Sequence, residues 1–253
     1  MAAKAATLYR DNGAAIAYHH TPGTTPGVIF CTGFRSNMQG GKALALEENC
    51  RARGQQCTRF DYQGHGQSSG EFTDCTIGAW LGDTLDVLDK VTSGPQILVG
   101  SSMGGWVALL AACARPGRVA GFVGIASAVD LTRRLWDRID EATRTLLRTE
   151  GLWMRPSEYE EAGYPITMKL IEEGRDHLLL PGPIPFAGPV RLLHGQRDDA
   201  VPWELSLETA RALASESVEI ILVKDGDHRL SRDEDLARLL RTVDEVSERL
   251  RQG

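Results

Sequence analysis

Gly100-Ser101-Ser102-Met103-Gly104 is the stretch that decides the fold of this chain. It has the pattern G-x-S-x-G, follows an apolar run at 97–99 and precedes a run with helical character at 105–114. A strand, a tight turn and a helix in that order form the context that a nucleophile elbow requires. Glycines flank the serine because the strand and the helix pass close together at such a turn. The pattern predicts Ser102 as a nucleophile at the carboxyl end of a sheet, and the alternative is a chance Gly/Ser turn.

A nucleophilic serine needs a base, and the base needs an acid that orients it. After a nucleophile elbow these partners follow in the order acid, then histidine. The turn after an expected strand at 190–194 carries the neighbours Asp198 and Asp199, and the spacing H-G-x-x-D-x-x-V-P over 194–202 selects Asp198. Asp199 is then expected to face the loop exterior. His228 follows an expected strand at 218–223, so both partners lie past strand ends, where open α/β sheets place their sites.

The other five histidines have structural interpretations that compete with a catalytic role. His194 ends a strand and is expected to be a hydrogen-bonded structural residue. His19 and His20 end an early strand, and His65 lies in a glycine-rich loop. His177, in the middle of the chain, is the strongest competitor, although a partly exposed polar side chain accounts for it.

Two backbone N–H groups are needed to hold the oxyanion of the reaction. Met103 follows the serine and supplies one of them. The loop 32–38, which follows an expected strand at 27–31, should supply the other, and Gly33-Phe34 occupies the corresponding position. The Phe34 N–H is therefore the predicted second donor. The alternative is that Phe34 serves only as a core-facing aromatic residue.

Alternating strands and helices predict an α/β fold with a mostly parallel sheet covered on both faces. The expected strands lie at 7–10, 14–20, 27–31, 56–61, 97–99, 119–126, 190–194 and 218–223, and the helices at 42–53, 77–91, 105–114 and 232–251. The loop at 61–70 is too rich in glycine for a helix. It also lacks the G-K-[ST] sequence of a phosphate-binding loop.

The alternation of strands and helices is interrupted between residues 128 and 189, and this segment is called the insert below. It carries many large apolar residues between charges, which is too apolar for a linker and too long for a simple turn. We expect a small helical lid over the catalytic face, with residues 1–127 and 190–253 forming the core. The alternative is an ordinary crossover helix followed by a loop.

The composition limits which binding partners and which cellular compartment are expected. The 253 residues are 42% hydrophobic and 25% charged with a net charge of −6, so neither nucleic acid nor an anionic membrane is an expected partner. No run approaches the roughly 18 apolar residues of a membrane span. The five cysteines lack a C-x-x-C pair, which indicates reduced thiols, and Cys31 is expected to be buried packing. No cluster has metal-ligand spacing, and we expect neither a metal nor a cofactor.

These motifs place the chain in the α/β-hydrolase superfamily. Longer stretches at 94–106, 191–203, 59–62 and 227–229 resemble the family of alpha/beta-hydrolase domain-containing protein ten and its bacterial relatives. That family comprises acyl-protein thioesterases that also cleave acyl glucuronides. The resemblance runs from about residue 27 to the C-terminal helix, and it implies Ser102 as nucleophile, Asp198 as acid and His228 as base.

One departure from the family concerns the oxyanion loop. The resemblance implies Tyr or Phe followed by Leu, whereas this chain has Phe34-Arg35. A cation at Arg35 either favours a carboxylate-bearing substrate such as a glucuronide or points to solvent. The short N-terminal segment and the Arg-rich insert favour a cytoplasmic, bacterial-like protein. The alternative is a mitochondrial matrix protein whose transit peptide has been removed.

The predicted function is hydrolysis of carboxylic esters or thioesters through an acyl-enzyme. Its substrate would be a small acyl ester or thioester or an acylated protein, with oligomeric state left open. A carbon–carbon bond hydrolase or a cofactor-free haloperoxidase could use the same triad. A non-catalytic binder on this scaffold is a third alternative, since motif and fold do not determine function. A dehalogenase is disfavoured because such enzymes carry Asp where this chain has Ser102.

Overall fold

A computed structural model describes residues 4–156 and 163–252 of the chain. An eight-stranded sheet forms the centre of the molecule. Its strand order is β1-β2-β4-β3-β5-β6-β9-β10. The first two strands run antiparallel to their neighbours, and the remaining pairs are parallel. The strands are β1 (Ala6–Tyr9), β2 (Ala15–Thr21), β3 (Thr24–Cys31), β4 (Gln55–Phe60), β5 (Gln96–Ser101), β6 (Val119–Ile125), β9 (Val190–Gly195) and β10 (Val218–Val223).

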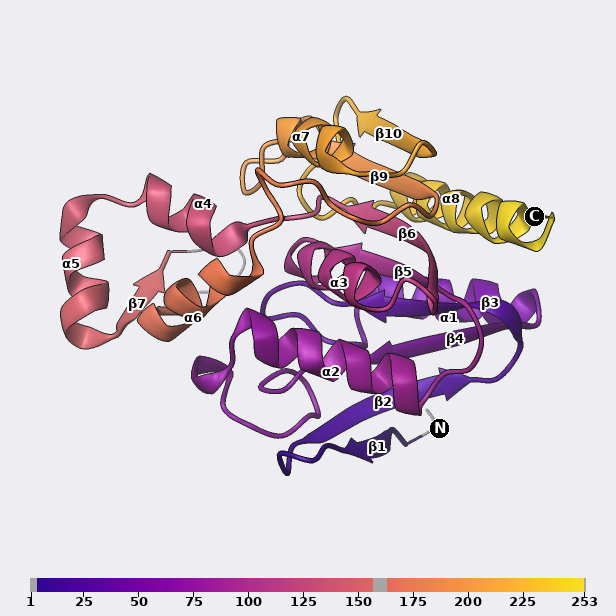
Figure 1. The fold of residues 1–253 in the computed structure, drawn as a ribbon, viewed down its shortest axis with the longest axis horizontal. Coiled ribbons are helices and arrows are strands. Elements are labelled where there is room, and N and C mark those ends of the chain that lie inside the picture. Colours follow the sequence, from indigo (N-terminus) through magenta and orange to yellow (C-terminus); the bar gives the residue numbers. More distant parts are fainter. Residues whose placement is uncertain (1–3, 157–162, 253) are drawn as a thin grey trace.

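Helices cover both faces of this sheet (Figure 1). Two pack on one face, α1 (Gly41–Ala52) and α8 (Asp233–Gln252), and they share an apolar cluster with Val28 and Val99. The opposite face carries α2 (Ile77–Lys90), α3 (Met103–Ala114) and α7 (Glu204–Ala212), around a second cluster that includes Trp80 and Trp106. A short 3₁₀ helix, η1 (Phe72–Asp74), precedes α2. The expected doubly covered, mostly parallel sheet is therefore correct.

Most element boundaries lie within three residues of those expected from the sequence. The largest difference is at the start of β3, which begins at Thr24, three residues before the expected start at 27. Its pairing with β4 shifts register between Thr24 and Val28, so the strand continues through an irregularity that a residue pattern does not reveal.

The connection from β5 to α3 is tight because glycines permit close backbone contact. A Cβ on Gly104 would overlap the carbonyl oxygens of Cys31 and Thr32 at the end of β3. A Cβ on Gly100 would lie 2.6 Å from the Cα of Gly105. Only a hydrogen on these α-carbons lets α3 start directly above the carboxyl end of β5. The residue between them, Ser102, is thereby lifted above the sheet.

The insert forms a lobe beside the main sheet, at the left of Figure 1. Its elements are α4 (Leu131–Arg138), α5 (Glu141–Glu150), β7 (Leu152–Arg155), β8 (Tyr164–Thr167), α6 (Met168–Glu173) and the 3₁₀ helix η2 (Gly174–His177). A small apolar cluster of its own holds it together and includes Leu135, Leu147, Ile166 and Ile171. Neither the domain boundaries nor the action of this lobe as a lid is tested by these contacts, and both remain predictions.

The helical prediction for the insert is wrong at β7 and β8, which pair as an antiparallel two-stranded sheet. Each strand has four residues, too few for a period-two pattern to be distinguished from a helical one. Trp153 pairs with Ile166 across this hairpin, and both belong to the cluster of the insert or pack against it. The long-range packing therefore selects strand geometry. Among the described residues, no helix has the length and apolar character of a membrane span.

Substituting Gly104 by alanine tests the close contact between α3 and β3. The added Cβ would meet backbone oxygens that have no side-chain freedom, so we expect a loss of about 1–3 kcal/mol in the free energy of unfolding. For a chain of this size that corresponds to roughly 2–4 °C in melting temperature per kcal/mol. Gly117→Ala is the matched control, because a Cβ there meets nothing within 4 Å. Equal melting temperatures for both variants would contradict this account.

Candidate active site

Ser102 adopts a backbone conformation that non-glycine residues rarely occupy, with φ of 53° and ψ of −120°. Hydrogen bonds hold it there from both sides. Its N–H donates to the Ile125 carbonyl at 2.8 Å, and its carbonyl accepts the N–H groups of Gly105 at 2.9 Å and Ala128 at 3.0 Å. Strain of this kind persists only where the surrounding structure over-determines it, and it concentrates at functional sites.

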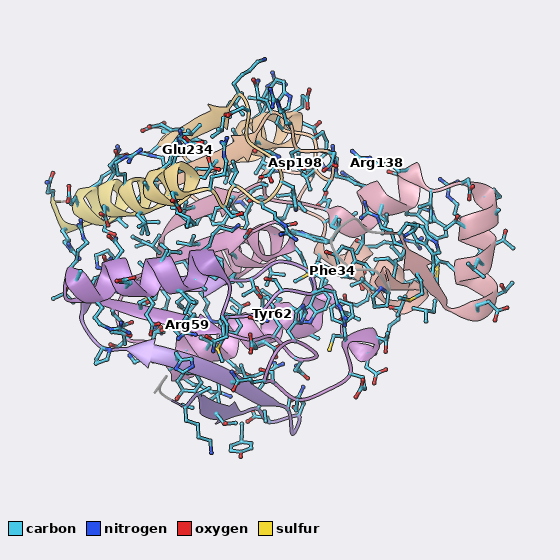
Figure 2. All side chains as sticks on the ribbon, turned by 180° about the vertical axis from the view of Figure 1, so that it is seen from behind. Phe34, Arg59, Tyr62, Arg138, Asp198 and Glu234 are labelled. Atoms are coloured by element: carbon cyan, nitrogen blue, oxygen red, sulfur yellow. The ribbon has the colours of Figure 1, made fainter. Side chains whose placement is uncertain are left out.

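The structure brings the three side chains predicted as a triad into one hydrogen-bonded chain. His228 Nε2 lies 3.1 Å from Ser102 Oγ, and His228 Nδ1 lies 2.7 Å from Asp198 Oδ2. A carboxylate can only accept, so Nδ1 carries the ring proton and Nε2 is free to accept from the serine hydroxyl. Asp198 lies past the end of β9. Asp198 and Phe34 both lie on the side of the sheet that faces the insert (Figure 2).

Asp198 is held as an anion although its carboxylate is fully buried. Burial works to raise its pKa, but hydrogen bonds from His194 and His228 outweigh burial and hold the pKa well below the usual range. The N–H groups of Ala200 and Val201 also donate to Oδ1, at 2.9 and 2.8 Å. Because the unfolded pKa is about 3.9, the ionised carboxyl stabilises the fold fully above that pH, and this contribution falls away in stronger acid.

His194 contacts the triad, a role that its position at a strand end did not predict. Its Nε2 lies 3.0 Å from Asp198 Oδ2 and 3.1 Å from the Val201 carbonyl, both acceptors, so Nε2 carries the proton. Its Nδ1 then accepts from the Ser206 hydroxyl at 2.8 Å. The expectation of a hydrogen-bonded structural residue is correct as far as it went. The missed signal was the four-residue spacing between His194 and Asp198 across the turn.

The two predicted oxyanion donors flank Ser102. Met103 is the first residue of α3, whose first N–H groups have no partner within the helix. Gly33 lies against Ser102, since a Cβ on it would be 3.5 Å from the serine Cβ, and Phe34 follows it. Within the described chain, neither the Phe34 nor the Met103 N–H donates a hydrogen bond. The Phe34 ring packs edge-on against Phe72, as the alternative interpretation expected, while its N–H stays available.

The loop after β4 holds the loop that carries Phe34. Asp61 Oδ1 accepts the Met38 N–H at 2.6 Å, and buried Arg59 donates to the Met38 carbonyl at 3.0 Å. Nearer the donor, His65 Nε2 accepts the Arg35 N–H at 3.3 Å. The backbone that follows Phe34 is therefore tied at Arg35 and again at Met38.

His65 acts here as a neutral hydrogen-bond acceptor. Its Nδ1 lies 3.1 Å from the Gln63 carbonyl, so Nδ1 carries the proton and Nε2 is left to accept. Burial lowers its pKa to about 4, a hydrogen bond to Gln63 opposes that change, and the charge of Arg35 adds to it. The ring packs edge-on against Phe72 and Trp80. The sequence showed only a histidine between glycines.

The structure places the remaining candidates away from the triad. His177 lies in η2 and pairs with Glu173 at 2.9 Å. His20, on β2, contacts Thr58 at 2.8 Å, and the neighbouring His19 lies on the same strand. Cys31 is buried, which raises its pKa to about 12 and leaves it as packing.

A cavity of about 780 Å³ opens above Ser102, within the size range of small-molecule sites. Phe34, Leu135, Tyr164 and Ile166 supply apolar walls. Basic side chains also line it, namely Arg35, Lys42, Arg155 and Arg229. Exposed Asp199 lies at this cavity and takes no part in the hydrogen-bonded chain from Ser102 to Asp198. The insert therefore forms part of the cavity wall that faces Ser102.

Comparison with known proteins shows the family of this chain. The model of the alpha/beta hydrolase family matches residues 28–241. The chain belongs to the alpha/beta hydrolase family. The structure of mouse alpha/beta hydrolase domain-containing protein 10 superimposes with a TM-score of 0.93 at 43% identity, over 98% of this chain and 100% of that one. The predicted α/β-hydrolase fold and the family resemblance are thereby confirmed.

Two further proteins, one mammalian and one bacterial, are similar to this chain. The mitochondrial palmitoyl-protein thioesterase ABHD10 of Bos taurus is 44% identical over 244 residues, which cover 96% of this chain and 80% of the bovine protein. A putative hydrolase from Agrobacterium vitis S4 superimposes with a TM-score of 0.91 at 36% identity, over 96% of this chain and 97% of that one. This α/β-hydrolase is thus similar over nearly its whole length to mammalian and bacterial proteins.

Replacing His65 by leucine tests whether it positions the Phe34 N–H. The variant loses the acceptor for the Arg35 N–H, and one hydrogen bond of this kind corresponds to roughly a tenfold change. We therefore expect a fluorophosphonate probe, whose adduct resembles the tetrahedral intermediate, to label Ser102 about tenfold more slowly. His65→Gln keeps an acceptor oxygen near the position of Nε2 and should recover most of the rate. Equal rates for both variants would contradict a positioning role.

Proposed function

We propose that this protein is a serine hydrolase that cleaves acyl esters and thioesters, and that it is an acyl-protein thioesterase. The observation that carries the proposal is the continuous chain Ser102–His228–Asp198, with distances of 3.1 and 2.7 Å. The names of the mammalian relatives, palmitoyl-protein thioesterases, support the thioester substrate. The alternatives of carbon–carbon hydrolysis, haloperoxidation and mere binding share the scaffold, and the relatives' names favour none of them.

In the proposed acylation step, Ser102 Oγ attacks the carbonyl carbon while His228 Nε2 accepts the hydroxyl proton. Asp198 stabilises the resulting imidazolium through the short contact to Nδ1. The Phe34 and Met103 N–H groups donate to the oxygen that becomes negative. Removing one such donor typically lowers the rate roughly 100- to 1000-fold. Collapse of the intermediate breaks the C–S or C–O bond, and the departing thiolate or alkoxide takes the proton from His228, which returns to its neutral form.

Deacylation repeats these steps with water. His228 accepts a proton from a water molecule that attacks the acyl carbonyl, and the same two N–H groups hold the oxyanion. The ester bond to Ser102 then breaks, the free acid leaves, and the proton returns to the serine. These steps require only side chains, backbone N–H groups and water.

The basic lining of the cavity favours a second substrate class, acyl esters with an anionic leaving group such as acyl glucuronides. Lys42 and Arg229 lie together, because the lysine ammonium donates to the Arg229 carbonyl. Burial lowers the pKa of Lys42 to about 8, against the raising effect of Asp227, so a bound carboxylate would favour its charged form. Arg35 lines the same cavity with its guanidinium 5.2 Å from the centre of the Phe72 ring.

The compartment remains a prediction. The relatives' names describe mitochondrial proteins, which supports the mitochondrial alternative, whereas the bacterial relative is in keeping with the cytoplasmic one.

Ser102→Ala tests the proposal. We expect hydrolysis of p-nitrophenyl acetate and of palmitoyl-CoA to fall by about 10⁵- to 10⁶-fold, and labelling by a fluorophosphonate probe to disappear. Ser101→Ala makes the same change one residue earlier and should retain both. A wild-type protein that neither turns over these substrates nor reacts with the probe would contradict a serine hydrolase. Undiminished turnover in Ser102→Ala would assign the reaction to another group.

A further inference from the structure

A second, smaller cavity of about 180 Å³ adjoins the one that contains Ser102. It lies between α4 and the loop that follows β9. The two cavities lie against each other, because they share five lining residues: Leu131, Leu135, Arg155, Ala200 and Val201.

The wall of this side cavity lies close to Ser102 and Asp198. Ala128 lines the side cavity, and its N–H donates to the Ser102 carbonyl at 3.0 Å. Val201 lines it too, and its N–H donates to Asp198 Oδ1 at 2.8 Å. Residues that wall the side cavity are therefore in direct contact with Ser102 and with Asp198.

The walls of the side cavity and of the larger cavity differ in polarity. The side cavity is walled by apolar residues that include Val129, Ile139, Trp153 and Leu205. Its basic residues besides Arg155 are Arg134 and Arg138 on α4, and Arg134 is already paired with Glu208 at 3.2 Å. In the larger cavity, polar and charged residues of the loops after β3 and β10 face Ser102, among them Asn37, Lys42 and Ser231.

We propose that the side cavity is the subsite for the acyl chain, and that it accommodates a medium-length chain. The inference deepens the proposed function and rests on it. An apolar chain gains most by entering the apolar side, and the leaving group then occupies the polar, basic side. A water molecule takes up about 30 Å³ of liquid, close to the volume of a methylene group, so 180 Å³ holds roughly six methylenes. The outer half of a palmitoyl chain extends beyond this subsite.

The proposal predicts a particular dependence on chain length. For p-nitrophenyl esters from acetate to octanoate, kcat/KM should rise roughly two- to fourfold with each methylene that enters the side cavity. From decanoate to palmitate it should level off or fall. All esters are compared below their aggregation concentrations, so that the profile reports the subsite.

Ile139→Trp tests the location of the subsite. Ile139 is half-buried and lines the side cavity, so the larger ring fills its volume. We expect the ratio of kcat/KM for octanoate to that for acetate to fall at least tenfold. Leu146→Trp is the matched control within the same lobe, because Leu146 is exposed on α5, and it should change the ratio less than twofold. Trp153→Ala enlarges the cavity and should move the optimum to longer chains, which keeps the proposal testable if Ile139→Trp does not fold.

The outcomes separate this inference from the function on which it rests. Absence of hydrolysis for every ester, together with absence of fluorophosphonate labelling, would overturn the serine hydrolase itself. Hydrolysis with a flat chain-length profile would overturn the acyl subsite alone, as would equal ratios in the Ile139 and Leu146 variants. A rise continuing to palmitate would overturn the medium-length limit.

Discussion

The strained backbone of Ser102 is the constraint on which the rest of the site depends. With φ of 53°, the residue turns the chain from β5 directly into α3, so the hydroxyl stands above the sheet beside the first N–H groups of the helix. Three backbone hydrogen bonds and the close contacts at Gly100 and Gly104 maintain this conformation. The large buried sheet supplies the stability that offsets the strain, and the other groups of the proposed site are arranged around a serine whose backbone cannot relax.

Around this fixed point, three loops at the carboxyl edge of the sheet each bring one group of the proposed site. The loop after β9 brings Asp198, the loop after β10 brings His228, and the loop after β3 brings the Phe34 N–H. The loops after β9 and β3 are held by groups that do not touch the reacting atoms. His194 contacts the Asp198 carboxylate, and His65 accepts from the backbone next to Phe34. Geometry is thus maintained by buried hydrogen bonds rather than by loop stiffness alone.

The residues with local signatures could be predicted from the sequence, and those defined by long-range packing could not. The elbow pattern and the H-G-x-x-D-x-x-V-P spacing point to Ser102 and Asp198, because turn geometry ties residue type to position over a few residues. His65 contacts Arg35 across 30 positions, and no pattern within its glycine-rich loop reveals that neighbour. The β7–β8 hairpin escaped prediction for a similar reason, since its short strands acquire their geometry from packing in the insert.

The most direct test of an acyl-enzyme on Ser102 is to measure the mass of the intact protein after quenching within milliseconds of mixing with a p-nitrophenyl ester. We expect a transient species heavier by one acyl group, and fragmentation should assign that group to Ser102. An adduct on a cysteine or on another serine would contradict the account. So would rapid release of p-nitrophenol without any acylated species under conditions where a stable acyl-enzyme standard is detected.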